Sequence, residues 1–229
     1  MQQFFYDETI EVNNLYPLAY EVNYQLKKVL RANDGYKFRL VDSNHHIFLC
    51  ELINNNAFVL EDLNENNELD VDITVVMALI KNDKFDFALQ KLTELGVKRI
   101  VPYIANRSVV KPGKNNNKLD RMNKIVREAS EQSHRNLIPE VTDYCTIKQL
   151  DKYLSDVNLI AYEKEDKLIN DLKNIKSVSI IIGPEGGFEK EEVEEIVHLG
   201  FSSISLGKRI LRAETAAIYL SSLLVGNNL

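Results

Sequence analysis

The spacing of apolar residues along the chain changes near residue 70. Before this point, short apolar segments such as residues 36–40 and 47–53 are separated by polar turns. This spacing is typical of β-strands in a small barrel or curled sheet. Residues 1–70 are therefore predicted to form a small β-rich domain.

One segment of this first domain, residues 19–30, has a helical spacing of apolar residues instead. The pattern places Tyr20, Tyr24 and Leu26 on one side of the predicted helix. The segment and the residue after it also carry the only obvious basic cluster of the domain, Lys27, Lys28 and Arg31.

From residue 71 onward, longer apolar runs alternate with helical patterns. A continuous apolar run at residues 73–80 predicts a buried strand, and the spacing after Asp83 predicts a helix that ends at Gly96. Residues 97–104 predict the next strand. Strands and helices joined by short connections indicate a parallel sheet with right-handed crossovers. We therefore predict that residues 71–229 form a doubly wound α/β domain.

Two glycine-bearing loops lie near the C-terminal end. One, with the sequence GPEGG, follows an apolar strand at residues 178–182, and the other opens at Gly207 after a strand at residues 203–206. Ligands of open α/β sheets bind beside the carboxyl ends of the strands, so we expect both loops to line a pocket. Their backbone groups and apolar flanks suit a flat heterocycle better than a polyphosphate, and the P-loop and dinucleotide motifs are absent. For the first loop alone, an ordinary turn is the alternative.

Two longer motifs carry a resemblance to a known family: GPEGGF at residues 183–188 and LGKRILRAETA at residues 206–216. Together they resemble the signature of the RsmE family, bacterial methyltransferases that act on N3 of a uridine in 16S ribosomal RNA and belong to the SPOUT (trefoil-knot) class. The resemblance covers essentially the whole chain, more loosely before Val71. Further matches in the family's order are residues 91–97, Arg107-Ser108, residues 128–133, Arg135 and Pro139.

The resemblance implies a fold and an activity. The fold is α/β, with a small N-terminal PUA-like β-barrel that binds RNA in residues 1–70 and a SPOUT α/β knot methyltransferase domain with a parallel sheet in residues 71–229. The activity is S-adenosylmethionine-dependent methylation of N3 of a specific uridine in the decoding region of 16S ribosomal RNA, in the small ribosomal subunit. SPOUT domains usually form a homodimer through terminal helices, so the apolar face of residues 216–224 is the candidate interface. Packing on the sheet is the alternative for that face.

The resemblance also implies a pocket for S-adenosylmethionine between the two glycine loops. Aliphatic side chains would cover the faces of the adenine, and backbone groups would bond its edge. The strand end at Ala161-Tyr162 would form a third wall. Glu185 would bond the ribose or amino group of the cofactor, or would cap the helix that follows. The predicted cofactor-binding residues are Ala161, Ile182, Gly183, Pro184, Glu185, Gly186, Gly187, Leu206, Gly207, Ile210, Leu211, Arg212 and Thr215.

Uracil N3 carries a weakly acidic proton, which must be lost before the nitrogen attacks a methyl group. A carboxylate would remove this proton, or a cation would stabilise the resulting anion. Arg212 and Glu214, on the second loop, are the predicted catalytic residues. Arg212 would bind a phosphate or a uracil oxygen, and Glu214 would hold Arg212 or cap the last helix. The sequence does not distinguish these roles and identifies no general base.

The charge of the chain is unevenly distributed. The formal net charge is −6, and residues 1–70 hold 5 Lys and Arg against 12 Asp and Glu. Residues 98–135 hold 10 against 3, so this segment is able to bind phosphates within an acidic protein. The alternative is a solvated helix face with a polar loop. The predicted RNA-binding residues are Lys27, Lys28, Arg31, Arg107, Lys111, Lys114 and Arg135.

Other features exclude several classes of site. Cys50 and Cys145 form no disulfide framework and have no metal-ligand spacing, which indicates structural thiols in a reducing compartment. His45 and His46 lie among polar turn residues, so no metal site is predicted. No apolar run approaches the length of a membrane span, and the N-terminus lacks a signal segment. We expect a soluble cytoplasmic protein that uses neither a membrane nor a metal.

Two other functions compete with uridine-N3 methylation. SpoU-type relatives methylate the ribose 2′-hydroxyl and carry a Ser-Leu-Asn segment in the last loop, whereas this chain has ILRAET at residues 210–215, which favours base methylation. The other is a non-catalytic ribosome-assembly protein that binds RNA with the same fold. The intact glycine loops argue against that function.

Overall fold

The computed structural model describes residues 1–110, 117–168 and 175–227. The chain folds into two compact units. The first comprises Met1–Glu68 and Ser130–Leu137, and the second comprises Leu69–Ala129 and Ile138–Leu229.

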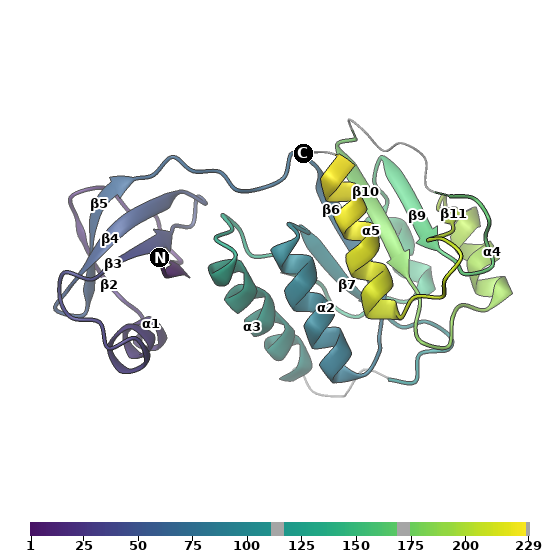
Figure 1. Cartoon of the computed structure of the whole chain (residues 1–229), viewed down its shortest axis with the longest axis horizontal. Helices are drawn as coiled ribbons and strands as arrows, with labels where there is room; N and C mark the ends of the chain where they lie inside the picture. The colour runs from purple at the N-terminus through teal and green to yellow at the C-terminus, as the bar shows by residue number, and fades with distance from the viewer. Residues whose placement is uncertain (111–116, 169–174, 228–229) are drawn as a thin grey trace. The chain divides into compact units, whose positions relative to one another are not determined.

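A curled, mainly antiparallel sheet forms the first unit (Figure 1). Its strand order is β1-β3-β4-β5-β2, with β1 and β3 parallel and the other neighbours antiparallel. The predicted alternation is confirmed in the middle of the sheet, where Phe38, Leu40 and Leu52 are fully buried. The strands are β1 (Gln3–Phe5), β2 (Leu15–Pro17), β3 (Lys37–Val41), β4 (Ile47–Ile53) and β5 (Asn56–Asp62).

The turn between β4 and β5 explains part of the register of this sheet. Ile53 pairs with Asn56, which leaves Asn54 and Asn55 as a two-residue loop. Their φ angles are 48° and 64°, the left-handed region that a tight hairpin of this length demands and that asparagine tolerates. The asparagine run therefore fixes the hairpin.

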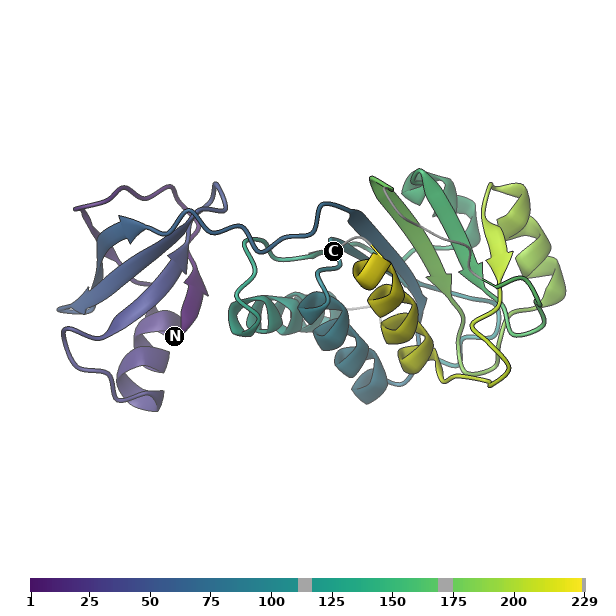
Figure 2. The same ribbon diagram turned by 45° about the horizontal axis from the view of Figure 1, so that its top comes forward.

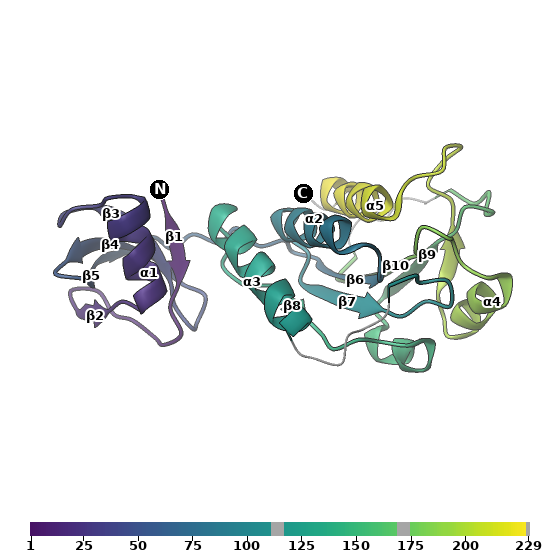
Figure 3. The ribbon, with the colours of Figure 1, turned by 90° about the horizontal axis from the view of Figure 1, so that it is seen from below.

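The helical segment of the first unit differs from its prediction. It consists of α1 (Tyr20–Tyr24) followed by a π-helical turn, Gln25–Val29. Leu26 is fully buried, but Tyr20 and Tyr24 are 76% and 52% exposed, so their predicted common side with Leu26 is wrong. Figure 3 shows α1 lying against one side of the curled sheet.

The second unit is built on a parallel sheet in the order β11-β9-β10-β6-β7-β8. The α/β class and the parallel sheet predicted from the sequence are thus confirmed. Strand β9 lies between β10 and β11, the two strands that precede the glycine loops (Figure 1). The strands are β6 (Asp72–Ala78), β7 (Arg99–Tyr103), β8 (Glu140–Val141), β9 (Val157–Ala161), β10 (Ser177–Ile182) and β11 (Ser202–Ile204).

Helices cover both faces of this sheet because the buried strands are apolar on both sides. Ile73, Val75 and Met77 share a core with α2, α3 and α5, whereas Val76 and Ala78 share a second core with α4 and a 3-10 helix. Figures 2 and 3 show α2 and α5 on one side and α4 on the other. The helices are α2 (Asn82–Glu94), α3 (Asn117–Gln132), the 3-10 helix Ile147–Tyr153, α4 (Lys190–His198) and α5 (Ala213–Asn227).

The predicted dimer face on the last helix lies inside the second unit. Ala217, Leu220 and Leu224 are fully buried in the same core as α2. Packing within the chain, the alternative weighed for this face, therefore accounts for its apolar character. Tyr219, on the same helix, is 43% exposed.

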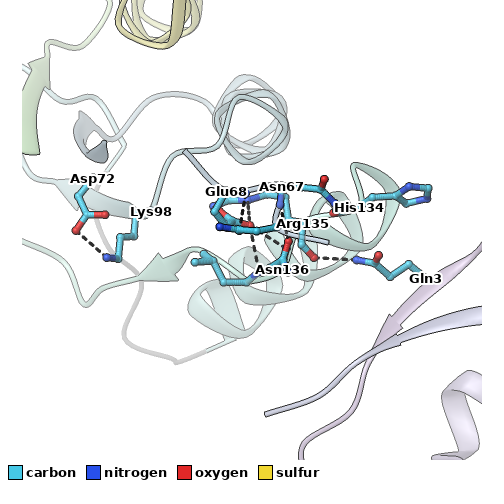
Figure 4. Close-up of polar contacts among 10 residues, drawn as sticks. Gln3, Asn67, Glu68, Asp72, Lys98, His134, Arg135 and Asn136 are labelled. Carbon is cyan, nitrogen blue, oxygen red and sulfur yellow. Dashed lines mark hydrogen bonds and ion pairs between the residues drawn. The ribbon is translucent and has the colours of Figure 1, made fainter. Parts of the chain in front are cut away.

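Residues 130–137, assigned from the sequence to the second domain, belong to the first unit. The guanidinium of Arg135, with only 4% of its side chain exposed, donates to the Glu68 carboxylate from Nη2 at 2.6 Å (Figure 4). The backbone N–H groups of Asn136 and Leu137 donate to the same carboxylate, and Gln3 donates to the carbonyl of Arg135. The prediction that Arg135 binds RNA is wrong, because its charge is buried and neutralised within the first unit.

The two cysteines are free and buried, as predicted for structural thiols. Burial raises the pKa of the Cys50 thiol to about 12 and that of Cys145 to about 11. His45 has φ 66° and lies in an exposed turn beside His46. Within the described ranges, no helix is long and apolar enough to cross a membrane, and no group of histidine, cysteine and acidic residues is arranged to hold a metal ion.

Removing the carboxylate of Glu68 tests the importance of this buried pair. Glu68→Ala should lower the free energy of unfolding by about 3–5 kcal/mol, because it leaves a buried arginine charge uncompensated. The matched control is Asp72→Ala, which removes the partner of Lys98 in a pair whose side chains are 51% and 55% exposed (Figure 4). That change should cost at most about 1 kcal/mol. Urea unfolding followed by circular dichroism measures both, and equal losses would contradict the structural role of Arg135.

Candidate active site

The loops that follow β9, β10 and β11 surround one pocket of about 400 Å³. Because parallel strands run in the same direction, these loops all emerge at the carboxyl edge of the sheet, where ligands of such sheets bind. The start of α5 closes the pocket through Ala213 and Ala216. The two glycine loops thus line a common site, as the sequence predicted.

Almost all residues predicted to bind a cofactor line this pocket. Thr215 is the exception, because it is exposed and lies outside the lining. The predicted residues at the pocket are Ala161, Ile182, Gly183, Pro184, Glu185, Gly186, Gly187, Leu206, Gly207, Ile210, Leu211 and Arg212.

Sequence reasoning missed several other lining residues. Glu163 lies two residues after β9, and Phe188 ends the first glycine motif, whereas Tyr162 lines the pocket as part of the predicted third wall. The positions of Glu163 and Phe188, next to a strand end and inside the motif, were the available signals. The remaining missed residues are Ser205, Lys208, Arg209, Ala213 and Ala216.

Different structural constraints explain why glycine occupies the three positions of the first loop. A Cβ at Gly183 would lie 2.7 Å from Cε2 of the buried Phe188 ring, so this ring occupies the space that glycine leaves. Gly187 has φ 67°, and its Cβ would lie 2.9 Å from Oε1 of Glu163. At Gly186 the nearest atom would be Cβ of Arg107, at 3.4 Å. Packing against Phe188 therefore explains the glycine at 183, and backbone conformation explains the glycine at 187. Neither explanation depends on a bound ligand.

Glu185 does not cap the following helix. Helix α4 starts at Lys190 with Glu189 at its N-cap position, so Glu185 lies too early in the chain. Its carboxylate lies 3.7 Å from Nζ of Lys84, and the residue lines the pocket. Of the two predicted roles, the capping role is wrong.

The N-terminal end of α4 anchors the loop that carries Arg107. The Glu192 carboxylate, on a 2% exposed residue, accepts hydrogen bonds from Tyr103 Oη at 2.7 Å and from the backbone N–H of Asn106 at 3.1 Å. Burial, reinforced by the bond to Glu192, raises the pKa of Tyr103. Arg107 in turn lies 3.5 Å from the Glu189 carboxylate and donates to the carbonyl of Gly186 at 3.4 Å. An exposed cation is thereby fixed beside the first glycine loop.

The two predicted catalytic residues are placed differently. Arg212 is exposed and lines the pocket, and its carbonyl accepts the N–H of Ala216 at the start of α5. Glu214 lies in the first turn of α5 and is not among the lining residues. Its Oε2 is buried and has no hydrogen-bond partner among the described residues.

The predicted RNA-binding residues do not form one group. Lys27 pairs with Asp34 at 2.8 Å, whereas Lys28 and Arg31 are exposed on the first unit. Arg107 is exposed on the second unit beside the pocket, and Arg135 is buried. Lys111 and Lys114 lie outside the described residues.

Comparison with known proteins identifies the family. A family model described as an RNA methyltransferase domain matches residues 67–225. Ribosomal RNA small subunit methyltransferase E of Mesomycoplasma hyopneumoniae is 36% identical over 225 residues, which cover 96% of this chain and 97% of that protein. The chain belongs to the ribosomal RNA small subunit methyltransferase E family. The RsmE resemblance is thereby confirmed, and the Bacillus subtilis member is 34% identical, with 97% of this chain and 95% of that protein covered.

Solved structures of similar proteins have the same fold over nearly the whole chain. The member from Neisseria gonorrhoeae, bound to S-adenosyl methionine, has a TM-score of 0.90 at 28% identity, with 98% of this chain and 96% of that chain covered. A methyltransferase from Legionella pneumophila, in complex with the same cofactor, has a TM-score of 0.90 at 30% identity with the same coverage. Both similarities extend through the two units of this chain.

Alanine substitutions in the first loop test the different roles of its glycines. Gly183→Ala should lower the free energy of unfolding by about 1–3 kcal/mol, because the new methyl group displaces the buried Phe188 ring. Gly186→Ala, the matched control, should change it by less than about 0.5 kcal/mol, since the methyl group meets Arg107 at an acceptable distance. Urea unfolding of both variants measures the difference. A Gly183→Ala protein as stable as the control would contradict the packing described for Phe188.

Proposed function

We propose that this protein transfers a methyl group from S-adenosylmethionine to N3 of a uridine in the decoding region of 16S ribosomal RNA, in the small ribosomal subunit. One observation carries the proposal: the two glycine loops line a single pocket. The members of this family are named as methyltransferases of the RNA of the small ribosomal subunit. The presence of the same cofactor in two structures of similar fold and similar length supports the choice of donor.

The residues of the pocket fit this donor. Its volume of about 400 Å³ falls in the range of small-molecule sites. Ile182, Leu206 and Leu211 are aliphatic side chains suited to the faces of an adenine, while the glycine loops offer backbone donors and acceptors to its edge. Glu163 and Glu185 bring negative charge to a site for a cationic ligand.

The bound donor supplies a reactive methyl group on a positively charged sulfur, so the protein has to position the reactants and exclude water. The loops after β9, β10 and β11 hold the donor in one orientation. Arg107, anchored by Glu189 beside Gly186, attracts the RNA backbone to the edge of the pocket. Lys28 and Arg31 bind RNA on the first unit.

Arg212 and Glu214 form the proposed catalytic pair. When uracil loses its N3 proton, negative charge spreads onto the neighbouring oxygens. The exposed guanidinium of Arg212 at the pocket stabilises this charge, a type of electrostatic stabilisation that contributes strongly to catalysis. Glu214, in the first turn of α5 two residues after Arg212, positions the end of the loop that carries Arg212.

The finer architecture follows the same family assignment. We propose a PUA-like barrel for residues 1–70 and a knotted SPOUT domain for residues 71–229, together with a cytoplasmic location. The curled sheet of the first unit and the parallel sheet of the second are consistent with these folds.

Introducing a charge into the apolar lining tests the donor site. Leu211→Glu should weaken S-adenosylmethionine binding at least about tenfold, because a carboxylate replaces an aliphatic contact at a cost above about 1.4 kcal/mol. Leu154→Glu makes the same change at a residue that is 45% exposed and outside the pocket, and should leave the affinity unchanged. Isothermal titration calorimetry measures both. Equal affinities in the two variants would refute the pocket as the donor site.

Mapping the product tests the reaction. Small subunits that lack the modification, incubated with the protein and labelled S-adenosylmethionine, should gain a methyl group on N3 of one uridine, detected by mass spectrometry of nucleosides. A methyl group on a ribose would contradict the proposed reaction, and donor binding without transfer would favour a non-catalytic role. Arg212→Gln should lower the rate of transfer about 100-fold or more, by removing the charge that stabilises the uracil anion.

We also propose a homodimer that uses the outer side of α5. The inner face of this helix is occupied by the core, but Tyr219 is 43% exposed. The protein should sediment at twice its chain mass of 26.3 kDa. Tyr219→Glu should shift it toward the monomer, because a buried interface disfavours an unpaired charge. A wild-type protein that stays monomeric at micromolar concentration would contradict this assembly.

A further inference from the structure

Two tyrosines of the first unit expose their rings side by side on α1. Tyr20 is 76% and Tyr24 is 52% exposed, and their ring centroids lie 6.2 Å apart with planes inclined by 32°. Residues four apart in a helix share one face. Val22 and Leu26, on the other side of the segment, belong to the core of the unit. The tyrosines therefore contribute little to the core, and their aromatic faces are open to a ligand.

The residues that follow extend this surface. Val29 and Leu30 are 64% and 39% exposed, which makes an unusual concentration of exposed large side chains over a short stretch. Large exposed apolar side chains grouped within a short stretch of chain often mark a binding surface. We refer to Tyr20, Tyr24, Lys28, Val29, Leu30 and Arg31 as the α1 surface.

Positive charge accompanies these aromatic side chains. The first 70 residues contain only 5 Lys and Arg, and three of these are Lys27, Lys28 and Arg31. Lys27 is paired with Asp34 at 2.8 Å. Lys28 and Arg31 are exposed, and no ion pair to either is found within the part of the chain that the structure describes. The most concentrated positive charge of an acidic segment thus directly follows the exposed tyrosines in the sequence.

Arg31 occupies a position where glycine is the common residue. The N–H of Ala32 donates to the carbonyl of Leu26 at 2.9 Å, six residues back, which closes the end of the π-helical turn around Arg31. Arg31 has φ 54°, a left-handed conformation that glycine adopts without cost and a long side chain does not. A glycine would end the helix more favourably. The arginine instead places a cation at the end of the α1 surface.

We propose that the α1 surface binds a single-stranded segment of the RNA substrate, with bases stacked on Tyr20 and Tyr24 and phosphates bound by Lys28 and Arg31. This inference rests on the proposed function, since it assumes an RNA substrate. Aromatic side chains next to cations are the usual composition of single-stranded nucleic-acid sites. Bases within an RNA duplex are covered by their neighbours, so only an unpaired segment offers faces to the tyrosines. The carboxylates of an acidic protein partner would pair with Lys28 and Arg31 but would not stack on the tyrosines.

The absence of tryptophan from the chain allows a direct test of stacking. Tyr24→Trp places a single indole on the α1 surface of the full-length protein. A short single-stranded RNA of mixed sequence should quench its fluorescence in a saturable manner, whereas a fully paired RNA of the same length should quench it much less. Equal quenching by both RNAs, or none by either, would overturn the proposal. Quenching by purified small-subunit proteins instead of RNA would show that the surface binds protein.

The affinity of the variants separates stacking from charge. Tyr20→Ala with Tyr24→Ala should raise the Kd for single-stranded RNA by about tenfold per tyrosine, with the salt dependence unchanged. Tyr20→Phe with Tyr24→Phe is the matched control, and should keep most of the affinity because the rings remain. Lys28→Gln with Arg31→Gln should reduce the slope of log Kd against log salt concentration by about 1.4, two phosphate contacts of about 0.7 each. Fluorescence anisotropy with a labelled RNA measures all three, and an alanine variant that binds like the phenylalanine variant would contradict stacking.

Donor binding distinguishes a failure of this inference from a failure of the proposed function. Calorimetry with S-adenosylmethionine should give the same affinity for the wild type and for each variant of the α1 surface, which also shows that the second unit is intact. Loss of RNA affinity with donor binding retained supports the proposal. If the wild type binds the donor and methylates its RNA while the alanine variant does so at an unchanged KM, the α1 surface is not part of the RNA site. If the wild type does not bind the donor, the proposed function fails.

Discussion

The parallel pairing of β9 with both β10 and β11 is the constraint on which the pocket depends. Parallel strands finish at one edge of the sheet, so loops from separate parts of the sequence are brought together there. With β9 in the middle, the two glycine loops start two strand spacings apart, about 10 Å. That distance accommodates a heterocycle between them. The loops need no direct contact with each other, because the sheet fixes their separation.

Much of this arrangement could be predicted from sequence, because it follows from general rules of α/β topology. The apolar runs that became β6 and β10 are buried on both faces, which leaves a clear signal. The order of the strands could not be predicted, because no local pattern in the sequence shows that β9 lies between β10 and β11. The sequence also did not reveal why residue 183 is a glycine. Only coordinates show that Phe188, five residues later, occupies the space beside it.

Charged and amphipathic side chains were the least predictable part of the site. Arg107 and Arg135 both lie in the basic segment, yet one is exposed beside the pocket and the other is buried against Glu68. A count of charges cannot separate these cases, because the partner carboxylate is distant in sequence. Tyr20 and Tyr24 illustrate the same difficulty for apolar spacing. Periodicity identified a helix, but in so short a segment it could not tell which side faces the core.

The first unit is assembled from two pieces of chain, because residues 130–137 complete it after a long excursion through the second. The bonds of Glu68 to Arg135, Asn136 and Leu137 join these pieces. A fragment cut near residue 70 would therefore lack part of its own interior. Such a module is difficult to exchange between proteins by recombination at a single junction. Inheritance of the two units together is the expected evolutionary outcome of this connectivity.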